Sequence, residues 1–156
     1  MTKTRITATG IVFNDNKETL MIFHKKLKKW VFPGGHVDEN ELPTDAALRE
    51  VFEETGIRAK LIPNRLNIDT DDEKIIEMDR PFCMLFMEYV VDENLYTSYD
   101  MSFLCQALNT NLKPQIEEID DIGWFSLEQI KQLNAFADCA ATVEKALEFI
   151  KEAETT

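Results

Sequence analysis

Three glutamates with helical spacing are the residues of this sequence best suited to chemistry. Glu50, Glu53 and Glu54 stand at positions i, i+3 and i+4, which places their carboxylates on one side of an α-helix. Like charges at this spacing destabilise a helix by roughly a few tenths of a kcal/mol per pair. Hard divalent cations bind clustered carboxylate oxygens and make the same arrangement favourable. The spacing therefore predicts a metal site, and a solvated acidic helix face is the alternative.

The residues around these glutamates predict a helix with two different faces. Pro43 suits the first turn of a helix, and Gly56 suits the left-handed residue that ends one. At about 100° per residue, an apolar stripe between them points almost opposite to the glutamates. The stripe consists of Leu48, Val51, Phe52 and Thr55. We therefore expect Val51 and Phe52 to be buried and Glu50 to face a cleft.

The glutamates belong to a longer pattern over residues 35–57, which read GHVDENELPTDAALREVFEETGI. This segment matches G-x5-E-x7-R-E-U-x-E-E-x-G-U, where U is apolar, at every defined position. It resembles the Nudix box, and the chain is similar to the MutT-like Nudix hydrolases, most strongly over residues 31–57. A solvated acidic face explains one glutamate pair but not the whole pattern, so we favour the metal site.

The resemblance implies a divalent metal ion, Mg²⁺ or Mn²⁺, as the cofactor. In the Nudix family the backbone carbonyl at the position of Gly35 contributes to metal binding, and Glu53 and Glu54 match the principal metal-binding carboxylates. Glu50 matches a position that serves as a metal ligand or as the catalytic base, depending on the member. A glycine also lets the backbone approach a ligand closely, in agreement with this role for Gly35.

The resemblance also implies residues that support these glutamates. Arg49 matches the arginine that orients them by ion pairing, and it can reach Glu53 at i+4. Glu41 matches the first glutamate of the box, whose role is more peripheral. An additional acid often comes from a distant loop in this family. Glu118 or Glu117 is the candidate here, as auxiliary metal ligand or base, and an exposed acidic loop is the alternative.

A basic segment precedes the box and could bind substrate phosphates. The net charge is −12, so an anionic substrate is repelled unless metal ions and local basic groups offset the field. Four lysines follow His24 within a few residues, namely Lys25, Lys26, Lys28 and Lys29. We predict that one or two of them contact the substrate. A solvated hairpin loop is the alternative.

Hydrophobic patterning predicts a series of strands with helices in the middle and at the end of the chain. We expect strands over residues 5–14, 19–24, 30–32, 59–62, 82–91, 101–108 and 123–125. Residues 33–35 and 92–100, the latter with Tyr96 and Tyr99, are predicted turns, and 64–80 a loop. A capping box at Ser126 predicts a short helix, and residues 137–152 a longer one. This order indicates a single α+β domain over residues 1–156, an α/β/α sandwich around a mixed sheet, as the resemblance also implies.

Composition narrows the setting in which the chain works. The strong negative charge argues against broad binding to nucleic acid or to membrane surfaces. No stretch approaches the ~20 apolar residues of a membrane helix, and the polar start does not fit a signal peptide. Cys83, Cys105 and Cys139 have no C-x-x-C spacing and are expected to be reduced thiols of a cytoplasmic protein. The sequence leaves the oligomeric state open, and a homodimer is one option.

These observations together predict a metal-dependent hydrolase. Clustered carboxylates without a nucleophilic Ser or Cys motif favour attack by metal-activated water. The resemblance supplies the substrate, a nucleoside diphosphate derivative, and we lean to a nucleoside triphosphate or related nucleotide. Two alternatives share the fold: an isopentenyl-diphosphate-type isomerase, which needs a reactive cysteine, and a non-catalytic nucleotide-sensing domain.

Overall fold

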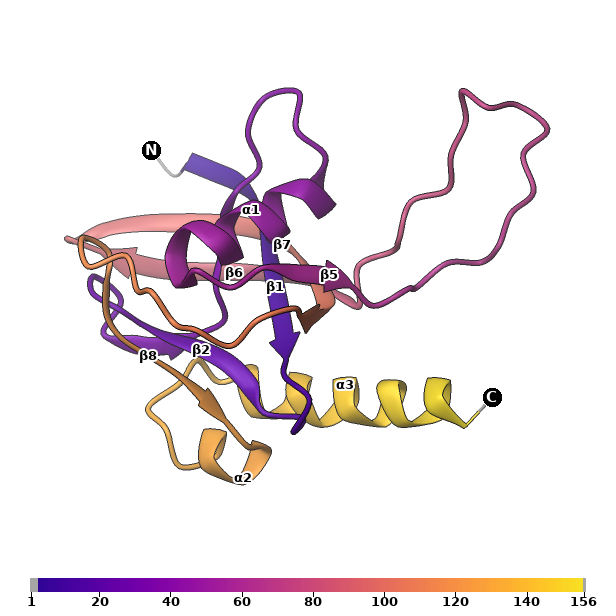
Figure 1. Cartoon of the computed structure of the whole chain (residues 1–156). Coiled ribbons are helices and arrows are strands. Elements are labelled where there is room, and N and C mark those ends of the chain that lie inside the picture. The colour runs from indigo at the N-terminus through magenta and orange to yellow at the C-terminus, as the bar shows by residue number, and fades with distance from the viewer. Residues whose placement is uncertain (1–2, 156) are drawn as a thin grey trace.

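The computed structural model describes residues 3–155, and a mixed eight-stranded sheet forms its centre (Figure 1). The strands are β1 (Lys3–Phe13), β2 (Thr19–His24), β3 (Lys29–Val31), β4 (Gly34–His36), β5 (Ala59–Leu61), β6 (Cys83–Val91), β7 (Asn94–Ala107) and β8 (Ile119–Phe125). The main path is β3-β2-β1-β7-β5, while β4 also pairs with β1, β6 with β7 and β8 with β2. Strands β1 and β7 run parallel, and the remaining pairs are antiparallel.

Helices cover both faces of this sheet. Helix α1 (Pro43–Thr55) packs on one face and α3 (Cys139–Glu154) on the other, while the short α2 (Leu127–Ile130) precedes α3 (Figure 1). Successive side chains of β1 point to opposite faces. Ala8 and Val12 join the core beside α1, whereas Ile11 and Phe13 join the core beside α3. The predicted α/β/α sandwich around a mixed sheet is therefore confirmed.

The box helix begins and ends where its sequence predicts. Pro43 occupies the first turn of α1, where a missing N–H costs nothing. Gly56 follows the last helical residue with φ +75°, the left-handed conformation that glycine adopts without steric cost. Its N–H donates to the carbonyl of Phe52 at 2.8 Å. These two residues set the length of the helix that carries the glutamates.

The prediction that Phe52 is buried is wrong. Val51 is fully buried, but Phe52 is 42% exposed and carries the guanidinium of Arg58 4.5 Å from its ring centroid. The buried face centres on Val51, and Phe52 lies roughly 100° around the helix from it. Glu54 lies only about 60° from Val51 on the other side and is 3% exposed. The carboxylates therefore adjoin the buried face instead of opposing it.

Two predicted turns are strands in the structure. The turn after β6 contains only Asp92 and Glu93, both with positive φ, so β7 already begins at Asn94. A two-residue turn of this kind matches the twist of the paired strands, and Tyr96 and Tyr99 lie in β7. Gly34 forms β4 against β1, where a Cβ on Gly34 would meet the carbonyl oxygen of Ala8 at 2.7 Å. Close backbone approach, not a turn, explains this glycine.

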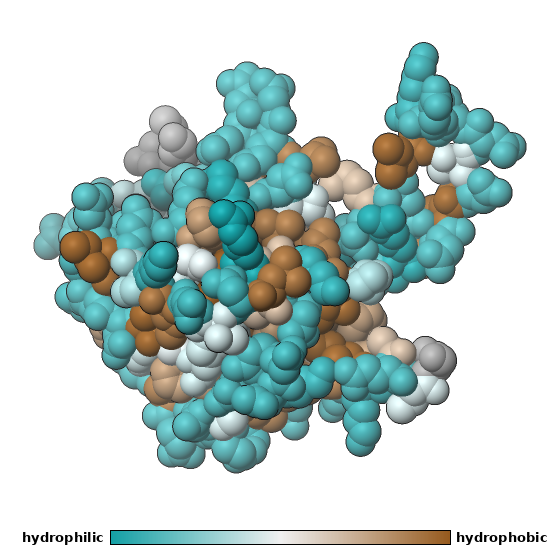
Figure 2. Space-filling view, in the orientation of Figure 1, coloured by the Kyte–Doolittle hydropathy of each residue, from teal (hydrophilic) through white to brown (hydrophobic). Residues whose placement is uncertain are grey.

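The segment 62–82 has no regular secondary structure and projects from the body of the molecule (Figure 1). The Glu77 carboxylate organises it by accepting hydrogen bonds from the backbone N–H groups of Leu66 and Ile68. Ile75 and Ile76 are exposed, and Figure 2 shows apolar side chains on this projection. The loop predicted over 64–80 is confirmed. Within residues 3–155, no helix is long and apolar enough to cross a membrane.

Candidate active site

Helix α1 presents its three glutamates at three depths. The residue Glu54 is almost completely buried, the Glu50 side chain is 17% exposed, and the Glu53 side chain is 51% exposed. This gradient follows from the helix geometry. At about 100° per residue, the angle around the helix from Val51 increases in the order Glu54, Glu50, Glu53, which is also the order of increasing exposure. The face therefore runs from the protein interior to solvent, and its inner end is a carboxylate removed from water.

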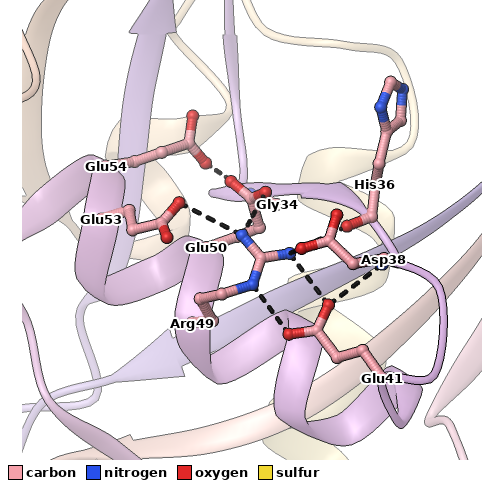
Figure 3. Close-up of polar contacts among 8 residues, drawn as sticks. All are labelled: Gly34, His36, Asp38, Glu41, Arg49, Glu50, Glu53 and Glu54. Atoms are coloured by element: carbon pink, nitrogen blue, oxygen red, sulfur yellow. Dashed lines mark hydrogen bonds and ion pairs between the residues drawn. The ribbon is translucent and has the colours of Figure 1, made fainter.

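Arg49 holds the outer glutamates and the loop before the helix (Figure 3). Its guanidinium donates to both carboxylate oxygens of Glu41 at 2.7 and 3.0 Å. It also donates to Glu50 at 2.9 Å, to Glu53 at 3.1 Å and to the carbonyl oxygen of His36 at 3.0 Å. The bond to Arg49 lowers the pKa of Glu41, and the bond to Glu41 raises the pKa of Arg49. Glu41 and Arg49 do not line the cavity described below, so Arg49 contacts the glutamates from outside it.

Glu54 and Glu50 are held against the glycine strand β4. Glu54 Oε1 accepts a hydrogen bond from the N–H of Gly34 at 2.8 Å. Burial raises the pKa of Glu54 to about 8, against the effect of that bond, and the charges of Glu50 and two other glutamates add to the rise. Burial also raises the pKa of Glu50, although Arg49 opposes the shift. A Cβ on Gly35 would meet the Glu50 carboxyl carbon at 2.5 Å, so a side chain at this position would displace the Glu50 carboxylate.

The donor chemistry of this cluster fits a divalent cation. The carboxylates and the adjacent backbone offer only hard oxygen ligands, and buried acids with raised pKa values become favourable when a cation replaces their protons. Among the residues that the structure describes, no three His, Cys, Asp or Glu side chains form a ready metal site. Gly34 bonds Oε1 of Glu54, and Arg49 bonds Oε1 of Glu50 and Oε2 of Glu53, so the second oxygen of each carboxylate takes part in none of these bonds.

The glutamates open onto a cavity of about 510 Å³ on the α3 side of the sheet. Glu117 and Glu118 line it with Gly35, Glu50, Glu53 and Glu54. The segment before β8 reaches this point because it runs along the end of α1. There the N–H of Lys113 donates to the Thr55 carbonyl at 2.8 Å. The negative charge of Glu118 contributes to the raised pKa of both Glu50 and Glu54, so Glu118 lies close enough to interact with each of them.

Three of the predicted lysines, Lys25, Lys26 and Lys28, lie in the turn between β2 and β3, and Lys29 begins β3. Only Lys26 of the four lines the cavity. Lys25 Nζ donates to the carbonyl of Ile116 at 2.8 Å, and Lys29 Nζ donates to Asn134 Oδ1 at 2.7 Å. Lys28 has a positive φ within the turn. The basic segment is therefore divided between structural contacts and one cavity residue.

Several cavity residues were not predicted from the sequence. Arg5 lines the cavity, with its guanidinium carbon 4.4 Å from the centroid of the Tyr96 ring and its Nη1 3.0 Å from His36 Nε2. His24 Nδ1 accepts from two backbone N–H groups of the lysine hairpin, and burial lowers the pKa of His24 although Glu118 opposes this. The floor carries five small or acidic polar residues: Thr7, Thr9, Ser98, Asp100 and Ser102. These residues are two positions apart along β1 and along β7, a spacing that places polar side chains on one face of each strand and that is visible in the sequence.

Comparison with known proteins assigns this chain to a family. A family model described as NUDIX domain matches residues 3–146. A probable DHNTP pyrophosphohydrolase of Lactococcus lactis subsp. cremoris is 28% identical over 80% of this chain and 64% of its own length. An RNA pyrophosphohydrolase of Bartonella tribocorum is 55% identical over 67% of this chain and 61% of its own. A putative 8-oxo-dGTP diphosphatase of Bacillus subtilis is 43% identical over 33% of this chain and 34% of its own. The chain thus spans less than two thirds of each of these relatives.

Solved structures agree on the fold. A NUDIX-family hydrolase from Clostridium perfringens superposes with a TM-score of 0.79 at 24% identity, over 94% of this chain and 97% of that one. A C. elegans Ap4A hydrolase in a binary complex has a TM-score of 0.66 at 18% identity, over 95% and 98%. The family match covers most of the chain. Four residues of the box, Gly35, Glu50, Glu53 and Glu54, line one cavity. The chain therefore belongs to the NUDIX domain family.

Proposed function

We propose that this chain is a metal-dependent hydrolase that cleaves a diphosphate linkage in a nucleoside triphosphate or related nucleotide. The observation that carries the proposal is the buried Glu54, with its raised pKa, beside Glu50 and Glu53 at the edge of the cavity. Such a cluster is unfavourable by itself and suits a hard cation. The names of the relatives support the reaction class, since each is a diphosphatase or pyrophosphohydrolase.

The roles of the residues follow from their depth and contacts. Glu50, Glu53, Glu54 and the carbonyl of Gly35 would hold Mg²⁺ or Mn²⁺. A bound metal ion of this kind neutralises phosphate charge and lowers the pKa of a bound water. Glu50 or Glu118 takes a proton from the attacking water while the water oxygen forms a bond to phosphorus. The P–O bond that bridges the two phosphoryl groups breaks at the same centre. The products are a nucleoside monophosphate, or another phosphate ester, and the remaining phosphoryl fragment.

Basic residues of the cavity would bind the phosphate chain. Lys26 and Arg5 both line the cavity, whose other charged residues are mostly carboxylates. With a net charge of −12, the protein repels anions except near such groups and the metal. Lys25, Lys28 and Lys29 then add positive potential from the hairpin. The same negative charge favours a small nucleotide over RNA, although one relative is named an RNA pyrophosphohydrolase.

The alternatives make different demands on the site. An isomerase of the isopentenyl-diphosphate type requires a reactive cysteine. Burial raises the pKa of Cys105 to about 12 and also raises that of the cavity residue Cys139, so neither thiol is a ready nucleophile. A sensor domain would bind nucleotide without turnover.

We propose a cytoplasmic location because Cys83, Cys105 and Cys139 are free thiols.

A magnesium-dependent substrate screen tests the proposal. Purified protein is incubated with nucleoside triphosphates, dinucleoside polyphosphates, ADP-ribose and triphosphorylated RNA in ¹⁸O-labelled water, and the products are identified by mass spectrometry. The expected result is ¹⁸O in one phosphate product of a small nucleotide. Binding without turnover by the wild type would identify a sensor domain. Turnover confined to RNA would show that the substrate is RNA and not a small nucleotide. The Glu54→Gln variant controls for a contaminating hydrolase.

A further inference from the structure

A row of polar residues crosses the floor of the cavity where the two parallel strands meet. Alternation places Thr7 and Thr9 of β1 and Ser98, Asp100 and Ser102 of β7 toward the cavity. In the pairing register Thr7 lies opposite Asp100, and Thr9 lies opposite Ser102. Apolar side chains, including Leu85, Met87 and Phe136, surround the row. A polar row of this kind in an apolar pocket is costly to bury unless each group finds a partner.

Asp100 is held as a hydrogen-bond acceptor. It is 3% exposed, and its Oδ1 accepts from Thr7 at 2.8 Å and from Thr9 at 2.7 Å. Its Oδ2 accepts from Ser102 at 2.8 Å. An ionised carboxylate offers about four acceptor sites, so Oδ2 keeps one after these three bonds. The three hydroxyls thus orient the carboxylate and leave acceptor capacity that only a donor can use.

Ser98 has a hydroxyl without a partner. It is 1% exposed, it lines the cavity, and its Oγ has no hydrogen bond to any residue within 3–155. Leaving a buried hydroxyl unpaired costs free energy, and replacing it by a methyl group would remove that cost. A ligand that supplies the missing partner would offset it. The burial of Ser98 beside Asp100 therefore points to a polar group of the ligand at this floor.

We propose that Ser98 and Asp100 recognise the exocyclic amino group of the substrate's nucleobase. This rests on the proposed function, in which the phosphate chain lies at the glutamates. The Asp100 carboxylate repels a phosphate, so the part of the substrate above the floor is not anionic. An amino group donates to Asp100, while the hydroxyl of Ser98 can donate to or accept from the same edge of the base. The surrounding apolar side chains contact the faces of the ring.

Matched nucleotides test this recognition without turnover. GMP and IMP differ only in the 2-amino group, and AMP and purine riboside monophosphate differ only in the 6-amino group. Titration calorimetry with Mg²⁺ measures the affinity of the wild type for each. We expect one amino-bearing nucleotide to bind at least about tenfold more tightly than its deamino partner, because a site built around a donor rejects the analogue that lacks it.

Three variants separate recognition from structure. Ser98→Ala should weaken binding of the preferred nucleotide severalfold with an unchanged or higher melting temperature, an outcome that a merely structural serine would not produce. Asp100→Asn should abolish the discrimination; if it fails to fold, Ser98→Ala still decides. Thr4→Ala, on the opposite face of β1, is the matched control and should keep the discrimination.

The outcomes also separate this inference from the proposed function. Equal affinity for both members of each pair, or full discrimination in Ser98→Ala, overturns the inference. Metal-dependent hydrolysis of triphosphates would stand in that case. If no mononucleotide binds, the inference is likewise overturned, and hydrolysis of triphosphates by the wild type then decides the proposed function separately.

Discussion

The Glu54 carboxylate accepts a 2.8 Å hydrogen bond from the backbone N–H of Gly34, a residue separated from it by 20 positions in the chain. The bond joins α1 to β4 and holds a carboxylate where only 3% of the residue is exposed. One neutral donor does not compensate such a group for lost hydration, so burial raises its pKa to about 8. The relationship makes a cation the expected partner of Glu54.

Activity should require a divalent metal. Because Glu50, Glu53 and Glu54 offer only hard oxygen ligands, we expect Mg²⁺ or Mn²⁺ to support turnover and a chelator to abolish it. Initial rates in metal-depleted buffer, with and without added Mg²⁺, provide the measurement. Full turnover in depleted buffer would exclude the proposed mechanism.

Replacing a single carboxylate should remove catalysis but not the fold. Glu53→Gln or Glu54→Gln keeps the size of the side chain and removes the charge that a hard cation needs. We expect kcat to fall by at least about 10²-fold, comparable to losing one strong electrostatic stabiliser. Circular dichroism should show an intact fold. Near-normal turnover in Glu54→Gln would mean that the ligands lie elsewhere.

The metal-free protein should lose stability as pH rises through the range set by Glu54. Its folded pKa of about 8 lies above the ordinary value of 4.5, so between these values the folded state holds a proton that the unfolded state releases. The stabilisation is complete below pH 4.5 and is lost as pH approaches 8. The melting temperature measured in chelator should therefore fall more steeply between pH 5 and pH 9 for the wild type than for Glu54→Gln.

Metal should reverse this pH dependence. Its binding displaces the Glu54 proton, so Mg²⁺ should raise the melting temperature more at pH 8 than at pH 6. Parallel wild-type and Glu54→Gln curves in chelator would show that Glu54 is not the titrating group.

Two neighbouring residues of α1 should differ sharply in their effect on stability. Val51 is fully buried, and Val51→Ala should lower the free energy of unfolding by about 2 kcal/mol through lost burial and a small cavity. Phe52→Ala should cost less, about 1 kcal/mol, since Phe52 is 42% exposed and loses mainly its contact with Arg58. Urea unfolding of both variants gives the comparison, and a larger loss for Phe52→Ala would contradict the observed packing.

Lys26 and Lys29 form a matched pair for testing substrate binding. Lys26 lines the cavity, whereas Lys29 bonds Asn134. Lys26→Glu should raise KM more than it lowers kcat, because it binds ground and transition states alike. The effect should shrink at high ionic strength, where exposed charges are screened. Lys29→Glu should have a much smaller effect, and equal effects would indicate only a general field from the hairpin.

The sequence by itself determined the box helix, its two ends and the set of carboxylates on it. These features are local: a helix repeats every few residues, proline and glycine mark its ends, and Arg49 reaches Glu53 within one turn. The alternating and apolar runs likewise predicted most strands and the sandwich, because periodicity reports which face of an element is buried. The box pattern also identifies the family, because its spacing is complete within one continuous segment.

Tertiary structure alone decided which residues share the cavity. Phe52 is exposed because the sheet covers the face centred on Val51, and helical spacing does not say how wide the covered face is. Lys26 lines the cavity, whereas the Lys29 side chain donates to Asn134, a residue more than a hundred positions away. The polar floor depends on the parallel pairing of β1 with β7, which joins residues more than ninety positions apart. Such pairings are set by the burial of the whole sheet between two helices, and no local pattern along the chain encodes them.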